Sequence, residues 1–170
     1  MRTLKLLLSV TLLTALPASA VEPASEARLD EVAGRGAEVM PFGLEKTTHI
    51  FMKTEQGGRQ QVVAKNPADA EQICLIREHL AEIATAFSRG DFSGPTRIHG
   101  GGMPGLEAMK NAQAGRIEYR YQELPDGAQI DYLTGERDLV QAIHRYFDAQ
   151  LSDHARHAVS RHEQHRLHER

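Results

Sequence analysis

The chain has 170 residues, one cysteine, and 20 lysines and arginines against 23 aspartates and glutamates, which gives a formal net charge of −3. This length corresponds to about one domain, which is large enough to bury a core without disulfides. The acidic balance argues against nucleic-acid binding, because that function needs a basic face. No segment beyond the first twenty residues is apolar for long enough to span a bilayer.

Residues 1–20 have the three regions of a cleavable secretory signal peptide. A basic start precedes an apolar run at residues 6–16, and the small residues Ala18-Ser19-Ala20 match a signal-peptidase site. The apolar run is about half the roughly 20 residues that a membrane-spanning helix needs, so no permanent anchor is expected. Cleavage would remove two basic and no acidic residues, leaving a mature chain with a net charge of −5. We therefore expect a periplasmic or secreted protein.

The next segment, residues 21–40, is predicted to be a flexible leader, or at most a short helix at residues 27–32. A single domain is expected over residues 41–158. Its first part reads as a β-hairpin, with strands at residues 47–54 and 60–65 around a Gly-containing turn.

A helix is predicted from the Asn66–Asp69 region to about residue 88, with Asn66 or Asp69 as its cap. Its apolar residues recur at steps of three and four, which is typical of a helix with one buried face. These residues are Ile73, Ile76, Leu80, Ile83 and Phe87. The lone cysteine, Cys74, is expected to be buried in this helix and cannot form an internal disulfide.

Residues 92–115 are rich in glycine and are predicted to form a long loop, with one short helix at residues 106–111. Loops of this length are uncommon in compact domains and tend to be functional or disordered.

The hairpin pattern then returns. Strands are predicted at residues 116–123 and 128–133 around Pro125-Asp126-Gly127, followed by a helix that opens at Arg137 or Asp138. Two units of strand, turn, strand and helix indicate a duplicated ββα unit. The expected fold class is α+β, with one antiparallel sheet covered on one face by two helices.

Histidines are the main candidates for chemistry, and five of the nine lie in the last seventeen residues. If the second helix continued through this tail, all five would fall within an arc of about 140° on one face. They are His154, His157, His162, His165 and His168. Imidazoles at such spacing can share one metal ion. The alternative is a polar extension, residues 159–170, that binds metal adventitiously.

A second candidate is the glycine-rich stretch that holds His99 and Met103. An imidazole and a thioether four residues apart can wrap a soft ion, and this ligand mixture favours copper. The alternative is that Met103 packs in the core and the glycines only turn the chain.

Three further histidines lie within the predicted elements. His49 shares a strand face with Phe51, where it can meet the loop that holds His99 or serve as a hydrogen-bonded strand residue. His79 lies one helical turn from Glu82, a spacing that a metal-binding carboxylate–imidazole pair also has, although a solvated face explains it equally. His144 follows the core residue Ile143 on the second predicted helix, and a solvated helix face explains this histidine equally.

Enzyme motifs are absent from the sequence. There is no Gly-x-Ser-x-Gly elbow, phosphate loop, dinucleotide fingerprint or His-Glu-x-x-His. Any catalysis would have to use a metal held by histidines, or loop carboxylates such as Asp91 and Glu107.

Several short stretches resemble a family of small exported bacterial proteins of unsettled function. They are Thr47-Thr48-His49-Ile50-Phe51, Ile76-Arg77-Glu78-His79-Leu80, Ile98-His99-Gly100 with Met103-Pro104-Gly105-Leu106, and Ser152-Asp153-His154. The resemblance covers roughly residues 41–158 and implies an exported single domain with motif histidines at 49, 79, 99, 144 and 154. Members are sometimes labelled aspartate carbamoyltransferase. That label does not fit, because such an enzyme is about twice as long and needs a Ser-x-Arg-Thr-Arg phosphate site, which this chain lacks.

These features predict an exported protein that binds or handles a transition metal, with copper first and nickel or zinc next. The predicted inner site draws on His49, His99, Met103, His154 and His157, with His144 nearby and weaker capture sites at His162, His165 and His168. Two alternatives stay open. One is a small enzyme with a metal-assisted pocket at the glycine-rich loop, and the other is a protein-interaction or stress module whose tail binds metal adventitiously.

Overall fold

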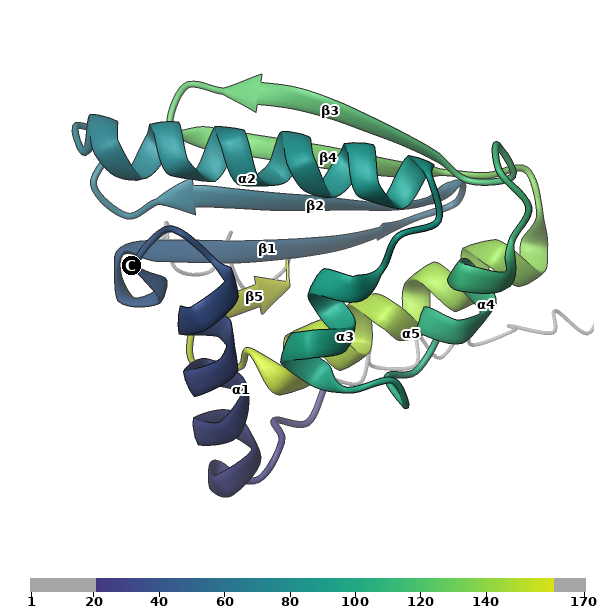
Figure 1. Cartoon of the computed structure of the whole chain (residues 1–170), viewed down its shortest axis with the longest axis horizontal. Helices are drawn as coiled ribbons and strands as arrows, with labels where there is room; N and C mark the ends of the chain where they lie inside the picture. The colour runs from purple at the N-terminus through teal and green to yellow at the C-terminus, as the bar shows by residue number, and fades with distance from the viewer. Residues whose placement is uncertain (1–20, 161–170) are drawn as a thin grey trace, which may run out of the picture.

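The computed structural model describes residues 21–160, and a five-stranded sheet lies at its centre (Figure 1). The strand order is β3-β4-β2-β1-β5, with every neighbouring pair antiparallel except β1 and β5, which are parallel. The strands are β1 (Thr47–Thr54), β2 (Gly57–Ala64), β3 (Glu118–Leu124), β4 (Gly127–Leu133) and β5 (Ala158–Ser160). The predicted α+β class is therefore confirmed.

Both predicted hairpins form, and the antiparallel pairing of β2 with β4 joins them into one sheet. β1 has the predicted bounds, whereas β2 begins at Gly57, three residues earlier than expected. Gly57 has a φ of 134°, and a Cβ there would lie 2.2 Å from the carbonyl oxygen of Tyr132. Gly57 is therefore not only a turn residue, as predicted. Because it has no Cβ, its backbone can approach β4 closely, and β2 pairs with β4 from Gly57 onward. Whether the two ββα units arose by duplication stays a hypothesis.

Two long helices, α2 (Ala70–Ser88) and α5 (Arg137–Asp153), pack on the same face of the sheet. The ring of Tyr132 on β4 contacts Phe87 of α2 at 6.2 Å and Phe147 of α5 at 5.1 Å, measured between centroids. Asp69 caps α2 by accepting a hydrogen bond from the backbone N–H of Gln72, as one of the two predicted caps. The two-helix cover is therefore confirmed.

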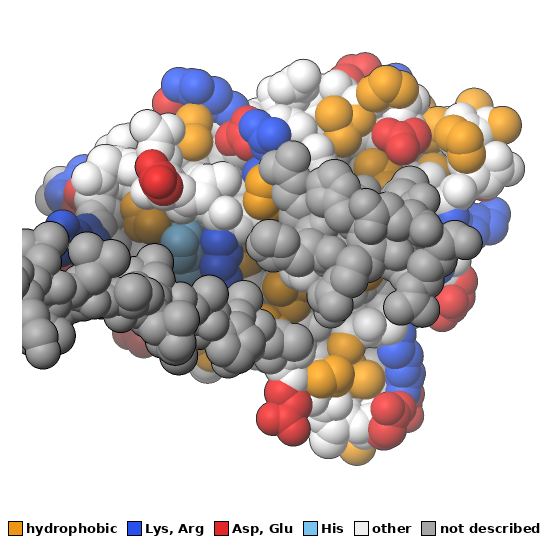
Figure 2. Space-filling model, turned by 180° about the vertical axis from the view of Figure 1, so that it is seen from behind, with side chains coloured by type: hydrophobic (Ala, Val, Ile, Leu, Met, Phe, Trp, Pro, Cys, Tyr) orange, Lys and Arg blue, Asp and Glu red, His pale blue; other side chains and the backbone are white. Residues whose placement is uncertain are grey.

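The opposite face of the central strands is polar. Arg59 on β2 pairs with Asp131 on β4, and the side chains of Gln61 and Gln129 are hydrogen-bonded beside them. Seen from behind, the described surface mixes acidic, basic and hydrophobic side chains without one broad patch of either charge (Figure 2). No helix within residues 21–160 is long and apolar enough to cross a membrane.

The segment expected to be a flexible leader forms a helix, α1 (Glu26–Val39), which is longer than the short helix considered for residues 27–32. Ser25 caps it, and the buried residues Leu29, Val32 and Gly36 follow helical spacing. In Figure 1 this helix stands below β1, beside α3. The segment is mostly polar, so the sequence did not predict a buried face. Only three of its residues are buried, because the helix contacts the domain along one narrow line.

The predicted long loop also contains more structure than expected. It holds a short helix, α3 (Ser93–His99), in addition to the predicted α4 (Leu106–Asn111). Pro95 does not prevent α3, because it lies in the first turn, where its missing N–H is not needed. A short 3-10 helix, η1 (Leu44–Lys46), precedes β1.

The second helix does not continue through His154 and His157, which was the condition for the histidine stripe. α5 ends at Asp153, His154 is its C-cap, and the chain turns back to form β5 alongside β1. His154 and His157 therefore do not share a helical face, and His162, His165 and His168 lie outside the described residues. Without β5, the edge of β1 would have unpaired backbone N–H and C=O groups. Hydrogen bonds between β5 and β1 stabilise the chain more than a further turn of polar helix would.

The expected burial of Cys74 is also wrong, since this side chain is exposed on α2. It lies one position beyond the buried Ile73 and outside the narrow stripe that faces the sheet. Its Sγ lies 3.4 Å from a carboxylate oxygen of Glu78, and this hydrogen bond raises the pKa of the thiol.

Candidate functional site

Three histidines from distant parts of the chain meet where α5 ends. His49 comes from β1, His99 is the last residue of α3, and His154 caps α5. All three are at least nine-tenths buried. The backbone N–H of His49 donates to the carbonyl of His157, and this first contact between β1 and the returning chain brings His154 beside His49. We call these three residues the histidine cluster.

The closest contact in the cluster joins two ring nitrogens. Nε2 of His99 lies 3.2 Å from Nε2 of His154, and the two rings are nearly perpendicular. The ring centroid of His49 lies 5.5 Å from that of His154. Nε2 of His49 is buried and has no hydrogen-bond partner among the described residues. A buried nitrogen without a partner lowers the free energy of unfolding by about 1–3 kcal/mol. We therefore expect a ligand, an ion or a water molecule to contact this atom.

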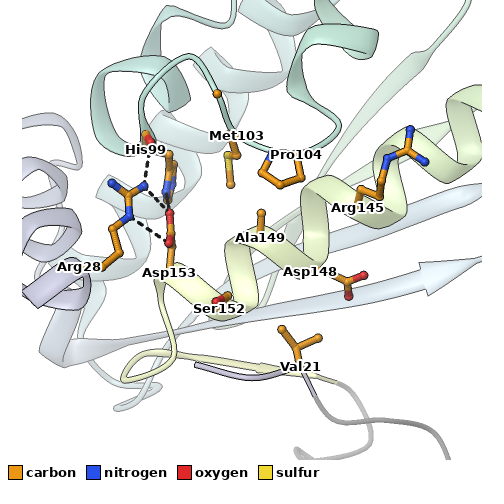
Figure 3. Close-up of a pocket in the computed structure, with 11 residues that line it drawn as sticks. Val21, Arg28, His99, Met103, Pro104, Arg145, Asp148, Ala149, Ser152 and Asp153 are labelled. Atoms are coloured by element: carbon orange, nitrogen blue, oxygen red, sulfur yellow. Dashed lines mark hydrogen bonds and ion pairs between the residues drawn. The ribbon is translucent and has the colours of Figure 1, made fainter. Parts of the chain in front are cut away.

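The other nitrogen of His99 is held by a carboxylate. Its Nδ1 lies 2.8 Å from an oxygen of Asp153, whose two oxygens also accept hydrogen bonds from Arg28 at 2.7 and 3.2 Å. Arg28 donates a further bond of 2.7 Å to the carbonyl of His99. Figure 3 shows these three side chains as one connected group between α1, α3 and α5. The position of His99 is thus fixed on both its ring and its backbone.

The electrostatics of this group determine which nitrogen carries a proton. Partial burial raises the pKa of the Asp153 carboxyl, but hydrogen bonds from His99 and Arg28 outweigh it and hold that pKa well below its ordinary value. The carboxylate is therefore ionised and can only accept. In neutral His99 the proton must then reside on Nδ1, so Nε2 presents its lone pair toward His154.

Burial also keeps the other two members of the cluster neutral. Desolvation, with smaller effects from neighbouring histidines, lowers the pKa of His49 to about 3 and that of His154 well below its ordinary value. At neutral pH both rings are uncharged, which is the state in which imidazole binds a metal ion.

A cavity of about 70 Å³ adjoins the cluster, and we call it the inner cavity. Its wall is mainly apolar, with side chains such as Phe42, Leu80 and Phe87, and it includes seven polar side chains. These are His49, Gln60, His79, His99, Tyr146, Gln150 and His154. A space of this size holds a few water molecules or a small ligand. Four of the five histidines named in the family resemblance therefore line one cavity.

The remaining predicted site residues lie elsewhere. Nε2 of His144 donates to the carbonyl of Thr54 at 3.0 Å, which ties α5 to the far end of β1. Nε2 of His157 lies 3.3 Å from Glu45, and neither histidine lines the inner cavity. Met103 is buried and lines, together with His99, a second and open pocket rather than the inner cavity (Figure 3). The ring of His99 contacts the ring of His154, and whether Met103 joins His99 in binding an ion stays a prediction.

Two residues of the site were missed by sequence reasoning, Arg28 and Asp153. Arg28 lies in the segment that was taken for a flexible leader, so nothing marked it. Asp153 stands directly before His154 in the Ser-Asp-His motif, and that adjacency was the one available signal.

Within residues 21–160, no group of three or more histidine, cysteine, aspartate or glutamate side chains is arranged to hold a metal ion. The described geometry therefore offers two converging nitrogens, with the unpartnered nitrogen of His49 beside them.

Comparison with known proteins adds no constraint on the site. No family model matches the chain, and neither a similar curated protein nor a similar solved structure is found.

Proposed function

We propose that this protein is an exported transition-metal-binding protein whose site is the histidine cluster. The observation that carries the proposal is the 3.2 Å separation of the two Nε2 atoms of His99 and His154. Two nitrogens that bind one tetrahedral ion at about 2.0–2.1 Å lie about 3.3 Å apart. The pair thus has the spacing of two ligands, and the buried nitrogen of His49 would supply the third.

The surroundings of His99 support this function. A metal-binding histidine usually donates its second ring N–H to a carboxylate, which fixes the ring and raises its basicity. Asp153 occupies this position toward Nδ1 of His99, and Arg28 holds Asp153 in turn. An ionised carboxylate and an arginine that are partly buried beside an imidazole cost desolvation free energy. A purely structural role would not require this ion pair, because apolar side chains of similar volume often stabilise a protein equally well.

Copper remains the first candidate, for a different reason than the sequence suggested. Because Met103 does not line the inner cavity, the proposal does not rest on its thioether. A site made of imidazole nitrogens binds Cu²⁺ most tightly among the divalent first-row ions, and also suits zinc and nickel. The signal peptide predicted at residues 1–20 would place such a site outside the cytoplasm.

The test is a metal titration of the demetallated protein with Cu(II), Cu(I), Ni(II) and Zn(II) under competition from a chelator. His162, His165 and His168 are replaced by Gln in every sample, so that the tail contributes nothing. We expect one ion per chain, with affinity at least a hundredfold weaker in His99→Ala and in His154→Ala. Asp153→Asn is expected to weaken binding about 10–100-fold.

The matched control is His144→Gln. This histidine lies on α5 but bonds a strand carbonyl instead of lining the cavity, so its loss should leave the affinity unchanged. X-ray absorption of the bound ion should show two or three imidazole nitrogens at about 2.0 Å. Unchanged affinity in the His99→Ala/His154→Ala double variant would refute the cluster as a metal site.

One observation favours a second function, a small enzyme that uses His99 as a general base. The ionised Asp153 holds Nδ1 of His99, which leaves Nε2 as the nitrogen that can accept a proton, and the inner cavity beside it could hold a small substrate. Such an enzyme would bind no metal at the cluster. A turnover that survives chelation and is abolished by His99→Gln would support it over the metal-binding function.

A further inference from the structure

The open pocket that Met103 and His99 line differs from the inner cavity, and we call it the outer pocket. It has a volume of about 470 Å³, within the usual range for small-molecule sites. Its walls come from α1, the turn before α4 and the last turns of α5. They include Arg28, Met103, Pro104, Arg145, Ala149 and Asp153.

Two arginines and two aspartates line the outer pocket, and three of these four side chains form ion pairs within the described residues. Arg28 pairs with Asp153, and Asp148 pairs with Lys53 at 2.5 Å. Arg145 is exposed, and its side chain makes no hydrogen bond or ion pair among the described residues. In Figure 3 its side chain rises from α5 on the side of Met103 and Pro104, whereas Asp148 leaves the helix on the other side. The guanidinium of Arg145 is therefore the one charged group lining the outer pocket that has no ion-pair partner among residues 21–160.

The floor beside this charge is apolar. Met103 is 6% exposed, and it lies with Pro104 and Ala149 along the side of α5 (Figure 3). The neighbouring Gly105 has a φ of 79°, and a Cβ at this position would lie 2.1 Å from the carbonyl oxygen of Ala142 on α5. The turn that carries Met103 therefore packs closely on α5. A ligand would thus meet a preformed surface with an apolar part and one guanidinium.

We infer that the outer pocket binds a small organic monocarboxylate, with its carboxylate on Arg145 and its hydrocarbon part on Met103, Pro104 and Ala149. The planar guanidinium donates two parallel hydrogen bonds to a carboxylate, and a short alkyl chain fits the apolar floor. The ring of His99 does not take part, since its side chain is 1% exposed and both its nitrogens face other partners. This site is independent of metal binding at the histidine cluster.

The experiment is a titration of the purified protein with sodium butyrate at constant ionic strength, followed by NMR of the Met and Ala methyl groups. Acetate, inorganic phosphate and butylamine are titrated in parallel. We expect saturable binding of butyrate with shifts at Met103 and Ala149, several-fold weaker binding of acetate, and no binding of butylamine. Tighter binding of phosphate than of butyrate would show an oxyanion site instead and overturn the proposal.

Arg145→Gln should weaken butyrate binding at least tenfold, and Arg145→Lys should retain part of it. The matched control is Arg97→Gln, because Arg97 is also exposed and unpaired within residues 21–160 but lies on α3 outside the pocket. Equal binding in wild type and Arg145→Gln would refute the site. Binding that persists with a chelator and in His154→Ala would separate this site from the histidine cluster.

Discussion

His49 and His157 each have a buried ring nitrogen that has no hydrogen-bond partner among residues 21–160. His49 is 4% exposed, its unpartnered atom is Nε2, and its ring contacts both Phe42 and His154. This unpartnered nitrogen supports the proposal that the histidine cluster binds a metal ion.

The lowered pKa of His49 makes stability depend on pH. The unfolded chain takes up a proton near pH 6.5 and the folded chain only near pH 3, so the unfolded state binds more protons between these values. Stability is therefore present above pH 6.5 and is lost as the pH falls. His49 alone should reduce the free energy of unfolding by about 2 kcal/mol between pH 7 and pH 5.

Urea unfolding of the metal-free protein at pH 7 and pH 5 checks this prediction. The loss on acidification should be smaller by about 2 kcal/mol in His49→Gln than in the wild type. His79 and His154, whose pKa values are lowered by burial, act in the same direction in both proteins. An identical loss in the two proteins would mean that His49 is not buried in its neutral form.

At the scale of elements, the attachment of α1 to the end of α5 is the main finding. Arg28 reaches Asp153, and Arg156 of the following turn reaches Glu26 and Asp30. The first pair is mostly shielded from water, whereas the second is exposed and contributes little. Beside the buried Leu29 and Val32, Arg28 is therefore the main polar attachment of α1, and it also holds the carboxylate that contacts His99.

Arg28→Ala should cost about 1–3 kcal/mol of stability, because it leaves a partly buried carboxylate with one partner fewer. The control is Arg35→Ala on the same helix, where an exposed pair with Glu31 is removed and the expected loss is below about 0.5 kcal/mol. Chemical denaturation gives both values. Equal losses would contradict the assignment of Arg28 as the main polar attachment of α1.

The turn before α4 gives a second prediction at this scale. Gly105 has a φ of 79°, and a Cβ there would lie 2.1 Å from the carbonyl oxygen of Ala142 on α5. Gly105→Ala should destabilise the protein by more than about 2 kcal/mol, since both backbone strain and a steric clash oppose the methyl group.

Gly102→Ala provides its control, because a Cβ at this position meets nothing within 4 Å. Its effect should stay within about 0.5 kcal/mol. Thermal melts of the two variants measure the difference. A Gly105→Ala protein as stable as the control would show that α4 does not pack on α5 as described.

For the whole molecule, the two hairpin–helix units share one core. Tyr132 lies between Phe87 of α2 and Phe147 of α5, and its hydroxyl donates to Gln60 on β2 at 2.6 Å. Neither unit can keep this packing when the other unfolds. The domain should therefore unfold in one cooperative step.

Far-ultraviolet and near-ultraviolet circular dichroism should give coincident unfolding curves for the wild type. Tyr132→Ala should lower the midpoint while keeping the two curves together, because it removes a side chain that both units contact. Two separate transitions in the wild type would show that the halves are independent folding units.

The sequence was informative wherever a pattern is local. The alternation in residues 47–54 predicted β1 with its observed bounds, and the spacing of Ile73, Ile76 and Leu80 predicted the buried stripe of α2. The sequence did not predict the structure correctly where a segment is ordered by contacts with residues that are distant along the chain. α1 looked too polar to be ordered until its docking against α3 and α5 is known, and α5 stops at Asp153 because β1 has a free edge.

By itself, then, the sequence determined the α+β class, the two hairpins with their helices, and three of the residues that form the site, His49, His99 and His154. Only the tertiary structure decided that these three meet, that Met103 and His144 do not line the inner cavity with them, and that Arg28 and Asp153 contact His99. The physical reason is that spacing along the chain fixes which residues share a face of one element. Contacts between faces depend instead on how the sheet edge, the helix ends and the returning chain pack together.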